Sequence, residues 1–365
     1  MIKKNVYMIL TNGFDPDVRV LKEAEYLISN GFEVEIICWD RKLEYLDKQY
    51  EEFNKIKIHR IPIFSNYGTG MKQLFPYLKF IFKVRNFLKK KSYFYLHCHD
   101  FDGVIAGLFT KNKKNKKIIF DMHEIYTNYG YAKNKLFKFI FNEVLEKVNY
   151  IVYVNDEQIK NYKVYSNKMI YLPNYPRQID YLPIKKNRKK IFKINYVGNL
   201  RDYDSLKCLA SVKDKKYKIG IYGYGVCYQR LYDEFSSTIY FYGKYNGIKD
   251  SVNIYQNTDI LYCVYNPNVE NWKNAYPVKL YEAIVTYTPI IVSANTKVAN
   301  FVDKNKIGVS IKYNNSKDLV NGIEKIIENY DQYVLNIQKI ANLYKWEQVV
   351  LNLLKIYKDG DEKND

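Results

Sequence analysis

The sequence is poor in the features that mark disulfide-stapled, metal-held or membrane-spanning proteins. Its five Cys are scattered without a Cys-x-x-Cys pair, and its four His do not match the spacing of a zinc site. We therefore expect no disulfide framework and no structural metal. No run approaches the roughly 18 consecutive apolar residues that span a membrane, and residues 5–10 are too short for a signal peptide. We expect a cytoplasmic protein, with peripheral contact at the inner face of the membrane as a further possibility.

Acidic residues are outnumbered by basic ones. The chain has 58 Lys and Arg against 39 Asp and Glu, a formal net charge of +19. This balance favours an acidic partner: a nucleic acid, an anionic membrane or a phosphorylated substrate. The same excess would also follow from a composition rich in Lys, Asn, Ile and Tyr throughout. Because the Lys residues are dispersed and no nucleic-acid-binding motif is present, we expect no nucleic acid partner.

Strand patterns alternate with helix patterns along the 365 residues, a length sufficient for two domains. The opening is a βαβ unit: an apolar strand at 5–10, a helix at 18–29 with Asp17 as its N-cap, and a strand at 33–39. Further strands are predicted at 57–61, 93–98, 118–122, 150–154, 169–172, 193–197, 218–222, 239–242, 260–264 and 289–293. The charged segment 183–190 lacks periodicity, so we read it as the interdomain linker.

Two predicted helices of the first half combine aromatic and basic residues. They span 71–91, which ends in three consecutive Lys residues, and 133–148. A basic amphipathic helix of this kind can lie on an anionic membrane surface. An ordinary helix that buries one face and solvates its Lys residues would have the same pattern, so both interpretations stay open.

Polar residues follow several strands at the edge where parallel sheets bind ligands. Two strands of the first half end in His97-Cys-His-Asp100 and Asp121-Met-His-Glu124. In the second half, strands run into Gly198 and into Gly223-Tyr-Gly225, where backbone can approach a phosphate. Arg201 and Lys207 follow as candidate cations for a pyrophosphate.

The stretch 274–293 predicts a helix and an apolar strand in close succession. Pro277 suits the first helical position, and Lys279 and Glu282 lie on the following helix. Pro289-Ile-Ile-Val-Ser293 is a strand of the buried parallel kind. The helix would direct its N-terminal amides toward a crevice of the sheet, which is where phosphorylated ligands bind.

These motifs, in this order, resemble retaining glycosyltransferases of family four. The opening carries the pattern Asp17, Arg19, Val20, Glu23, Ala24 and Leu27, and the strand ends and the stretch 274–289 match further segments of the family. The resemblance implies the GT-B fold: an α/β protein with two Rossmann-like domains that face a central cleft, and a last helix that crosses back onto the first domain. The implied domains are 1–182 with the crossover helix 345–360, which binds the acceptor, and 191–344, which binds the donor.

The resemblance also implies a set of site residues. The catalytic residues would be His123, Arg201 and Lys279. The donor would contact Gly13, Gly198, Asn199, Lys207, Gly223, Gly225, Asn274 and Glu282, with Glu282 on the ribose. The acceptor would contact Phe14, Asp15, His99 and Glu124. The sequence departs from the family at Asn199, where Arg is usual, at Asn274, where Glu is usual, and at Thr288, where Gly is usual.

The implied activity is transfer of a sugar from a nucleotide-sugar to a glycan or a lipid-linked glycan, with retention, in the synthesis of a cell-surface polysaccharide. The nucleotide-sugar would be a substrate, and neither a cofactor nor a metal would be needed. The alternative is a non-catalytic GT-B subunit that binds glycans or stabilises a partner, which the three departures favour.

Overall fold

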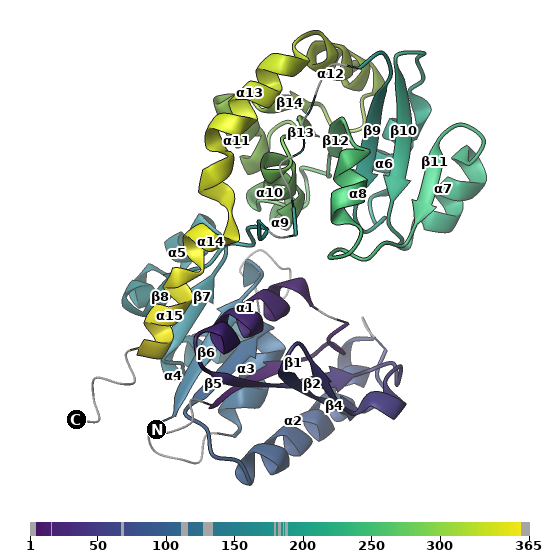
Figure 1. Ribbon diagram of the computed structural model, residues 1–365. Coiled ribbons are helices and arrows are strands. Elements are labelled where there is room, and N and C mark those ends of the chain that lie inside the picture. The colour runs from purple at the N-terminus through teal and green to yellow at the C-terminus, as the bar shows by residue number, and fades with distance from the viewer. Residues whose placement is uncertain are drawn as a thin grey trace. The chain divides into compact units, whose positions relative to one another are not determined.

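The computed structural model describes residues 5–358, except 16, 67–68, 111–115, 127–133, 179, 182–183, 185 and 187–188. The chain forms two compact units. One consists of Met1–Pro173 with Val349–Asp365, and the other of Asn174–Gln348. Each unit is a mostly parallel sheet with helices packed against it (Figure 1).

The sheet of the first unit has eight strands in the order β3-β4-β2-β1-β5-β6-β7-β8. All pairs are parallel except β3 with β4, which are antiparallel. The strands are β1 (Asn5–Leu10), β2 (Glu33–Asp40), β3 (Tyr50–Phe53), β4 (Ile56–Pro62), β5 (Tyr95–His99), β6 (Lys117–Met122), β7 (Tyr150–Tyr153) and β8 (Met169–Tyr171). The order reverses between β1 and β5, which is the position where such sheets bind ligands.

Helices cover both faces of this sheet. They are α1 (Val18–Ser29), α2 (Leu74–Lys89), α3 (Asp100–Leu108), α4 (Lys135–Lys147), α5 (Asp156–Asn161) and α15 (Leu351–Lys358), with 3₁₀ turns η1 (Leu46–Lys48), η2 (Gly70–Gln73) and η5 (Lys163–Lys168). Buried side chains of α2, α3 and α4 form one apolar core with alternate residues of the strands. On the opposite face, Tyr357 of α15 packs against Phe32 and Tyr95.

The strand alternation decides which residues face which side. Leu96 and Cys98 of β5 point into the apolar core beneath α2, α3 and α4. The intervening residues of β5, His97 and His99, therefore face the other side, which α15 covers, and His97 contacts Tyr357 there. The polar side chains at these strand ends are thus gathered on one face of the sheet.

The second unit is built on six parallel strands in the order β11-β10-β9-β12-β13-β14. They are β9 (Phe192–Val197), β10 (Tyr217–Tyr222), β11 (Tyr240–Gly243), β12 (Ile260–Cys263), β13 (Ile290–Ser293) and β14 (Gly308–Ile311). The helices are α6 (Tyr203–Ser211), α7 (Tyr228–Phe235), α8 (Ser251–Gln256), α9 (Glu270–Asn274), α10 (Val278–Val285), α11 (Lys297–Asn305), α12 (Ser316–Glu328), α13 (Tyr330–Ala341), the 3₁₀ turn η6 (Asn342–Tyr344) and α14 (Trp346–Val349). Buried residues of α6, α7, α12 and α13 share one apolar core with the sheet.

The predicted N-cap at Asp17 is confirmed, and at three other places the structure differs from the prediction. Asp17 caps α1, since its side chain accepts hydrogen bonds from the backbone N–H groups of Arg19 and Val20. The strand β3 was not predicted, because its sequence Tyr-Glu-Glu-Phe is polar. Over its described residues, the crossover helix predicted at 345–360 is broken into α14 and α15. Pro277 is the N-cap of α10 and not its first helical residue.

The segment that was read as a linker is in part packed on the second unit. Residues 183, 185, 187 and 188 of this segment lie outside the described residues, but Lys186 is buried. Its Nζ donates hydrogen bonds to the carbonyl oxygens of Tyr255 (2.7 Å) and Thr258 (2.5 Å). Lys189 pairs with Asp259 at 2.8 Å. The second unit begins at Asn174, so Lys186 and Lys189 belong to that unit.

Candidate functional site

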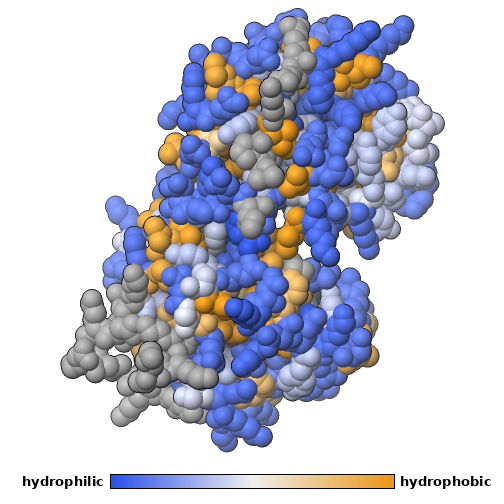
Figure 2. Space-filling model, viewed as in Figure 1, coloured by the Kyte–Doolittle hydropathy of each residue, from blue (hydrophilic) through white to orange (hydrophobic). Residues whose placement is uncertain are grey.

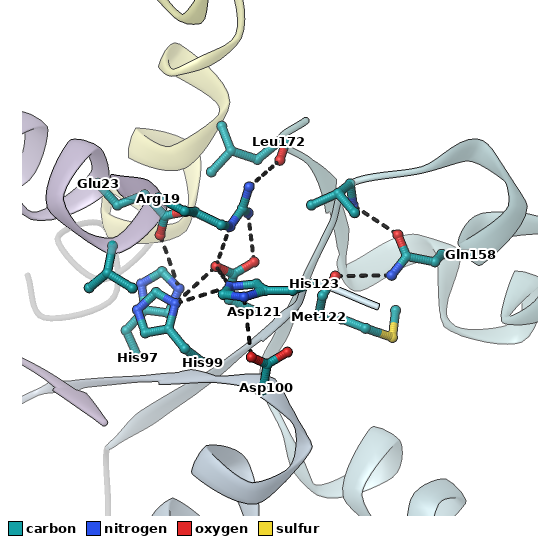
Figure 3. A network of polar contacts seen from close by, with 12 residues as sticks. Arg19, Glu23, His97, His99, Asp100, Asp121, Met122, His123, Gln158 and Leu172 are labelled. Carbon is teal, nitrogen blue, oxygen red and sulfur yellow. Dashed lines mark hydrogen bonds and ion pairs between the residues drawn. The ribbon is translucent and has the colours of Figure 1, made fainter. Parts of the chain in front are cut away.

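A network of charged side chains joins α1 to the ends of β5 and β6 (Figure 3). Its centre is Asp121, which is fully buried. Arg19 donates to both carboxylate oxygens, from Nε to Oδ2 at 2.8 Å and from Nη2 to Oδ1 at 2.7 Å. His99 Nδ1 and His123 Nε2 also contact Oδ2, at 3.0 Å and 2.8 Å. One buried carboxylate therefore fixes one guanidinium and two imidazoles.

The same contacts set the charge states of the network. Burial alone would raise the pKa of Asp121, but Arg19 and His123 lower it well below its ordinary value. Burial alone would lower the pKa of His123, but Asp100 and Asp121 raise it well above its ordinary value. These contacts favour the imidazolium form of His123, which lies between Asp121 and Asp100, with His123 Nδ1 3.3 Å from Asp100 Oδ2. In this state His123 can donate hydrogen bonds but cannot accept a proton.

Asp100 occupies an uncommon backbone conformation beside His123. Its φ is +60°, and its carboxylate accepts a hydrogen bond from the Tyr126 hydroxyl at 2.8 Å. A residue other than glycine in this region costs of order 1–3 kcal/mol, and such residues cluster at functional sites. The Asp100 side chain is 43% exposed, so the network reaches the surface at this residue.

A second tier of polar groups lies deeper, beneath α1 and α15. Glu23 and His97 are both fully buried, and His97 Nδ1 lies 2.9 Å from the Tyr357 hydroxyl. Burial raises the pKa of Glu23 to about 8, and Asp121 adds to this rise while Arg19 opposes it. Arg19 Nε is 3.2 Å from Glu23 Oε1, but its hydrogen bond goes to Asp121.

The expected site residues of the first unit fall into two groups. Gly13, Phe14 and Asp15 lie in the loop after β1, and this loop lines a cavity of about 290 Å³. The cavity is lined by Asn12, Gly13, Phe14, Asp15, Asp17, Asp40, Arg41, Lys42, Glu44 and Tyr45. His99 is 2% exposed and lies in the charged network, whereas Glu124 is exposed and its carbonyl oxygen accepts a bond from Gln158.

The loop that lines this cavity is held by its own polar contacts. Arg60 donates from Nε to the carbonyl oxygen of Gly13 at 3.0 Å and from Nη2 to that of Phe14 at 3.3 Å. A side chain at Gly13 would approach the ring of Tyr45 to 3.1 Å, so the glycine permits close packing of the loop. The Phe14 side chain is buried, and Asp15 is the exposed member of the three expected residues.

Glu282 is the centre of a second buried polar cluster, which lies in the second unit. Its Oε1 accepts a hydrogen bond from the Tyr181 hydroxyl at 2.9 Å, and its Oε2 accepts bonds from Tyr255 and Lys279, each at 2.6 Å. Burial alone would raise the pKa of Glu282, but Lys279 and the two tyrosines lower it below its ordinary value. The structure thus brings Lys279 and Glu282 together and adds two tyrosines that the sequence did not indicate.

The expected glycines of the second unit lie where two loops meet. Gly223 has φ +135°, and a Cβ there would collide with the carbonyl oxygen of Gly198. A Cβ at Gly225 would collide with the Asn199 side chain and would come within 2.6 Å of the carbonyl oxygen of Leu200. The loops after β9 and β10 therefore touch through backbone, and Asn199 is one of their contacts.

The remaining expected residues of the second unit lie at separate places. Arg201 is exposed, with its guanidinium 5.4 Å from the Trp272 ring. Asn274 ends α9, where its side chain donates to Glu270 Oε1 at 2.7 Å. Lys207 lies on α6, exposed and 5.7 Å from the Tyr203 ring.

Arg19, Glu23, His97 and Asp121 belong to the charged network but were not among the expected site residues. The signals that could have found them were present. Arg19 and Glu23 are four residues apart, so they share one face of α1. His97 and His99 are two residues apart on a strand, so they also share a face.

Comparison with known families covers most of the chain. Residues 17–174 match the family described as Glycosyltransferase Family 4, and residues 176–342 match the family described as Glycosyl transferases group 1. The fold and the paired matches define a glycosyltransferase of the GT-B class, with two Rossmann-like domains. The chain belongs to the glycosyltransferases that resemble family four. Among proteins with curated descriptions, none matches the sequence.

Solved structures of the same fold align over almost the whole chain. Sucrose-phosphate synthase from Thermosynechococcus elongatus has a TM-score of 0.76 at 14% identity, with 98% of this chain and 99% of that chain covered. Anabaena HepE in complex with UDP-glucose has a TM-score of 0.70 at 10% identity, with 97% and 99% covered. WaaG, a glycosyltransferase of lipopolysaccharide biosynthesis, has a TM-score of 0.66 at 14% identity, with 98% and 99% covered. In the described part of the chain, no helix has the length and hydrophobicity needed to cross a bilayer.

The raised pKa of Glu23 predicts a pH dependence of stability. Burial raises the pKa of Glu23 to about 8 in the folded chain, from an ordinary value of 4.5. The contribution of this group is fully present below pH 4.5 and is lost as the pH rises through the folded value. The free energy of unfolding of the wild type, relative to Glu23→Gln, should therefore fall between about pH 5 and about pH 9. Urea titrations in metal-free buffer measure this difference, and parallel pH profiles would contradict the prediction.

Alanine substitutions at Gly223 and Gly243 test whether the close contact between the loops after β9 and β10 contributes to stability. Both have positive φ, but a Cβ at Gly243 would meet no atom within 4 Å. Gly243→Ala should cost about 1 kcal/mol of stability from backbone strain. Gly223→Ala should cost about 3 kcal/mol or more, since the collision with Gly198 adds to the strain. Chemical denaturation gives both values, and equal losses would show that the close approach of the loops does not matter.

Proposed function

We propose that this glycosyltransferase moves a sugar from a uridine-type nucleotide-sugar to a glycan or lipid-linked glycan, with retention, in the synthesis of a cell-surface polysaccharide. The observation that carries the proposal is the position of His123 after β6, between the carboxylates of Asp121 and Asp100, in a chain whose two halves match two glycosyltransferase families. HepE structures of the same fold hold UDP or UDP-glucose, and WaaG acts in lipopolysaccharide synthesis. These similarities support the choice of donor and of pathway class.

His123 would position the transferred sugar. Its imidazolium keeps a short contact to Asp121 (2.8 Å) and a longer one to Asp100 (3.3 Å). A sugar hydroxyl could bind beside His123 Nδ1 and Asp100. The Asp100 carboxylate is partly exposed, so it can accept a hydrogen bond from that hydroxyl. The role is hydrogen bonding and electrostatic, since a protonated imidazole is not a general base.

The leaving diphosphate would be stabilised by positive groups of the second unit. Lys279 lies in the first turn of α10, where the backbone N–H groups carry partial positive charge. Arg201 follows the Gly198 turn after β9 and is exposed. Fixed positive groups of this kind stabilise the negative charge that develops as the sugar–phosphate bond breaks. We propose that no metal ion takes part in this step.

Glu282 would hold the ribose of the donor. In the structure its two oxygens are occupied by Tyr181, Tyr255 and Lys279. Tyr181 is the partner that a ribose hydroxyl can replace, because it offers the same O–H donor and comes from the segment before β9. The cavity of the β1–α1 loop would take part of the acceptor, with Asp15 and Glu44 available to accept hydrogen bonds from its hydroxyl groups.

An alternative function is a non-catalytic subunit that binds glycans. The observation in its favour is that every oxygen of Glu282 already has a partner within the chain. Binding without turnover would support this alternative. Thermal shift measures the binding of the nucleotide, and release of sugar from UDP-glucose measures turnover, so the two functions are distinguished.

The donor site predicts which nucleotides stabilise the chain. UDP and UDP-glucose should raise its melting temperature, since a ligand of the native state stabilises by mass action. Glu282→Gln should weaken this binding by about tenfold, equivalent to about 1.4 kcal/mol. The matched control is Glu324→Gln, the same change at an exposed position of α12. Thermal shift over a concentration series measures both. If no nucleotide shifts the wild type, or if Glu282→Gln behaves like Glu324→Gln, the donor site proposed here is wrong.

Peripheral contact with an anionic membrane would suit a lipid-linked acceptor. The visible face of the molecule is mostly hydrophilic with smaller apolar areas (Figure 2). Nevertheless, α2 exposes Phe75 and Phe82, and it also carries Lys79, Lys83 and Arg85. Exposed aromatic side chains beside basic ones are the combination that binds anionic lipid surfaces.

Removing the aromatic groups of α2 should therefore weaken vesicle binding. The double change Phe75→Ser and Phe82→Ser should reduce binding to vesicles that contain anionic lipid by about tenfold or more. The control is Leu335→Ser with Leu343→Ser, which removes two exposed apolar groups of the second unit. Vesicle co-sedimentation with anionic and with purely zwitterionic lipid measures the effect. Binding that is absent in the wild type, or equal in both double variants, would refute the membrane contact.

A further inference from the structure

Three of the four histidines, which the sequence does not place at zinc spacing, lie together in the first unit. His97 and His99 share one face of β5, and His123 follows β6. Glu23 of α1 lies over the rings of His97 and His99 (Figure 3). One possible ligand atom from each of Glu23, His97, His99 and Asp121 lies within 4.8 Å of the others.

Four buried polar atoms of this cluster have no hydrogen-bond partner among the described residues. They are His97 Nε2, His99 Nε2 and both carboxylate oxygens of Glu23. His97 Nε2 is 3.5 Å from Glu23 Oε2, too far for a good hydrogen bond. Buried polar atoms are nearly always paired, because leaving one unpaired costs stability. Glu23 Oε1 faces Arg19 at 3.2 Å, and the convergence of the other three atoms indicates a ligand that would satisfy them together.

The other ring nitrogen of each histidine is already oriented. His97 Nδ1 contacts the Tyr357 hydroxyl at 2.9 Å, and His99 Nδ1 contacts Asp121 Oδ2 at 3.0 Å. Histidines that bind metals use this arrangement, in which one nitrogen bonds to a carboxylate or another polar group and the second binds the ion. Asp121 accepts from His99, so His99 Nε2 carries the free lone pair when the ring is neutral.

We propose that Glu23, His97 and His99 bind a divalent transition-metal ion of the zinc type, with Asp121 and Tyr357 orienting the two histidines. Two imidazoles and a carboxylate form a donor set that binds zinc in preference to the hard cations Mg²⁺ and Ca²⁺. Arg19 and His123 pair with the carboxylates of Asp121 and Asp100, so Glu23 is the carboxylate that remains for the ion. Glu23 Oε2 is the oxygen available to the ion, since Oε1 faces Arg19 at 3.2 Å.

The ion would have a structural role and would take no part in sugar transfer. It would join α1 to β5 and, through Tyr357, to α15. The rings of His97 and His99 are nearly parallel, with their centroids 4.6 Å apart and 12° between their planes. Two Nε2 atoms bound to one ion would lie closer together than the present ring spacing, so the two rings would tilt toward each other at their Nε2 edges. This proposal is independent of the donor site, and its measurements do not use transfer activity.

The experiment uses the full chain, stripped with a chelator and then titrated with Zn²⁺, with Mg²⁺ as the comparison. The expected result is one Zn²⁺ per chain by elemental analysis, a rise of several degrees in melting temperature, and no response to Mg²⁺. Glu23→Gln should weaken Zn²⁺ binding by about 100-fold, and Tyr357→Phe, which removes no ligand, by about tenfold. Histidine NMR signals should change for His97 and His99 in the wild type.

The matched control is His59→Gln, which changes the histidine of β4 that lies outside the cluster. It should bind Zn²⁺ as the wild type does. If Glu23→Gln and His59→Gln bind Zn²⁺ equally, the ion is an adventitious surface ion only and the proposal fails. It also fails if stripped wild type gains neither stability nor stoichiometric zinc. Because Tyr357→Phe and Glu23→Gln keep the size of the side chains, a loss of binding with an unchanged circular dichroism spectrum is not a loss of fold.

Discussion

The buried pair of Arg19 and Asp121 is the interaction on which the polar face of the first unit depends. Two of the guanidinium nitrogens bind the carboxylate, and a third donates to the carbonyl oxygen of Leu172 at 2.9 Å. Asp121 then orients His99 and His123. Removing one partner of such a pair leaves the other charge buried, which costs about 3–5 kcal/mol. These contacts join helix α1 to the ends of β5, β6 and β8. The orientation of His99 and His123 depends on the same carboxylate.

The sequence predicts most of the fold because buried parallel strands are short apolar runs that can be seen without any knowledge of tertiary structure. Residues 5–10 and 290–293 are runs of this kind. Asp17, as an N-cap residue, indicates the start of the helix after the first strand. The strand Tyr50–Phe53 escapes such reasoning. It lies at the edge of the sheet and is mostly exposed, so its residues need not be apolar, and its pairing with β4 alone makes it a strand.

The sequence predicts where in the fold the candidate sites lie. It does not predict which side chains bond to each other there. Strand order brings His99 and His123 to one edge, and their residue types indicate binding chemistry. Which carboxylate holds which imidazole depends on the packing of α1 over the sheet, and sequence spacing does not report that packing. Tyr181 shows the same limit. It precedes a segment read as a linker, yet its hydroxyl is bonded to Glu282 across 101 residues.

The position of α15 has a consequence for biosynthesis. This helix is translated after the second unit, but its Tyr357 covers Tyr95 and His97 of the first unit. On the ribosome, the first unit must therefore wait through the translation of about half of the chain before its final helix arrives. During that interval the face around His97 lacks its cover, so a nascent chain exposes to solvent, and to chaperones, the polar groups that the finished protein buries.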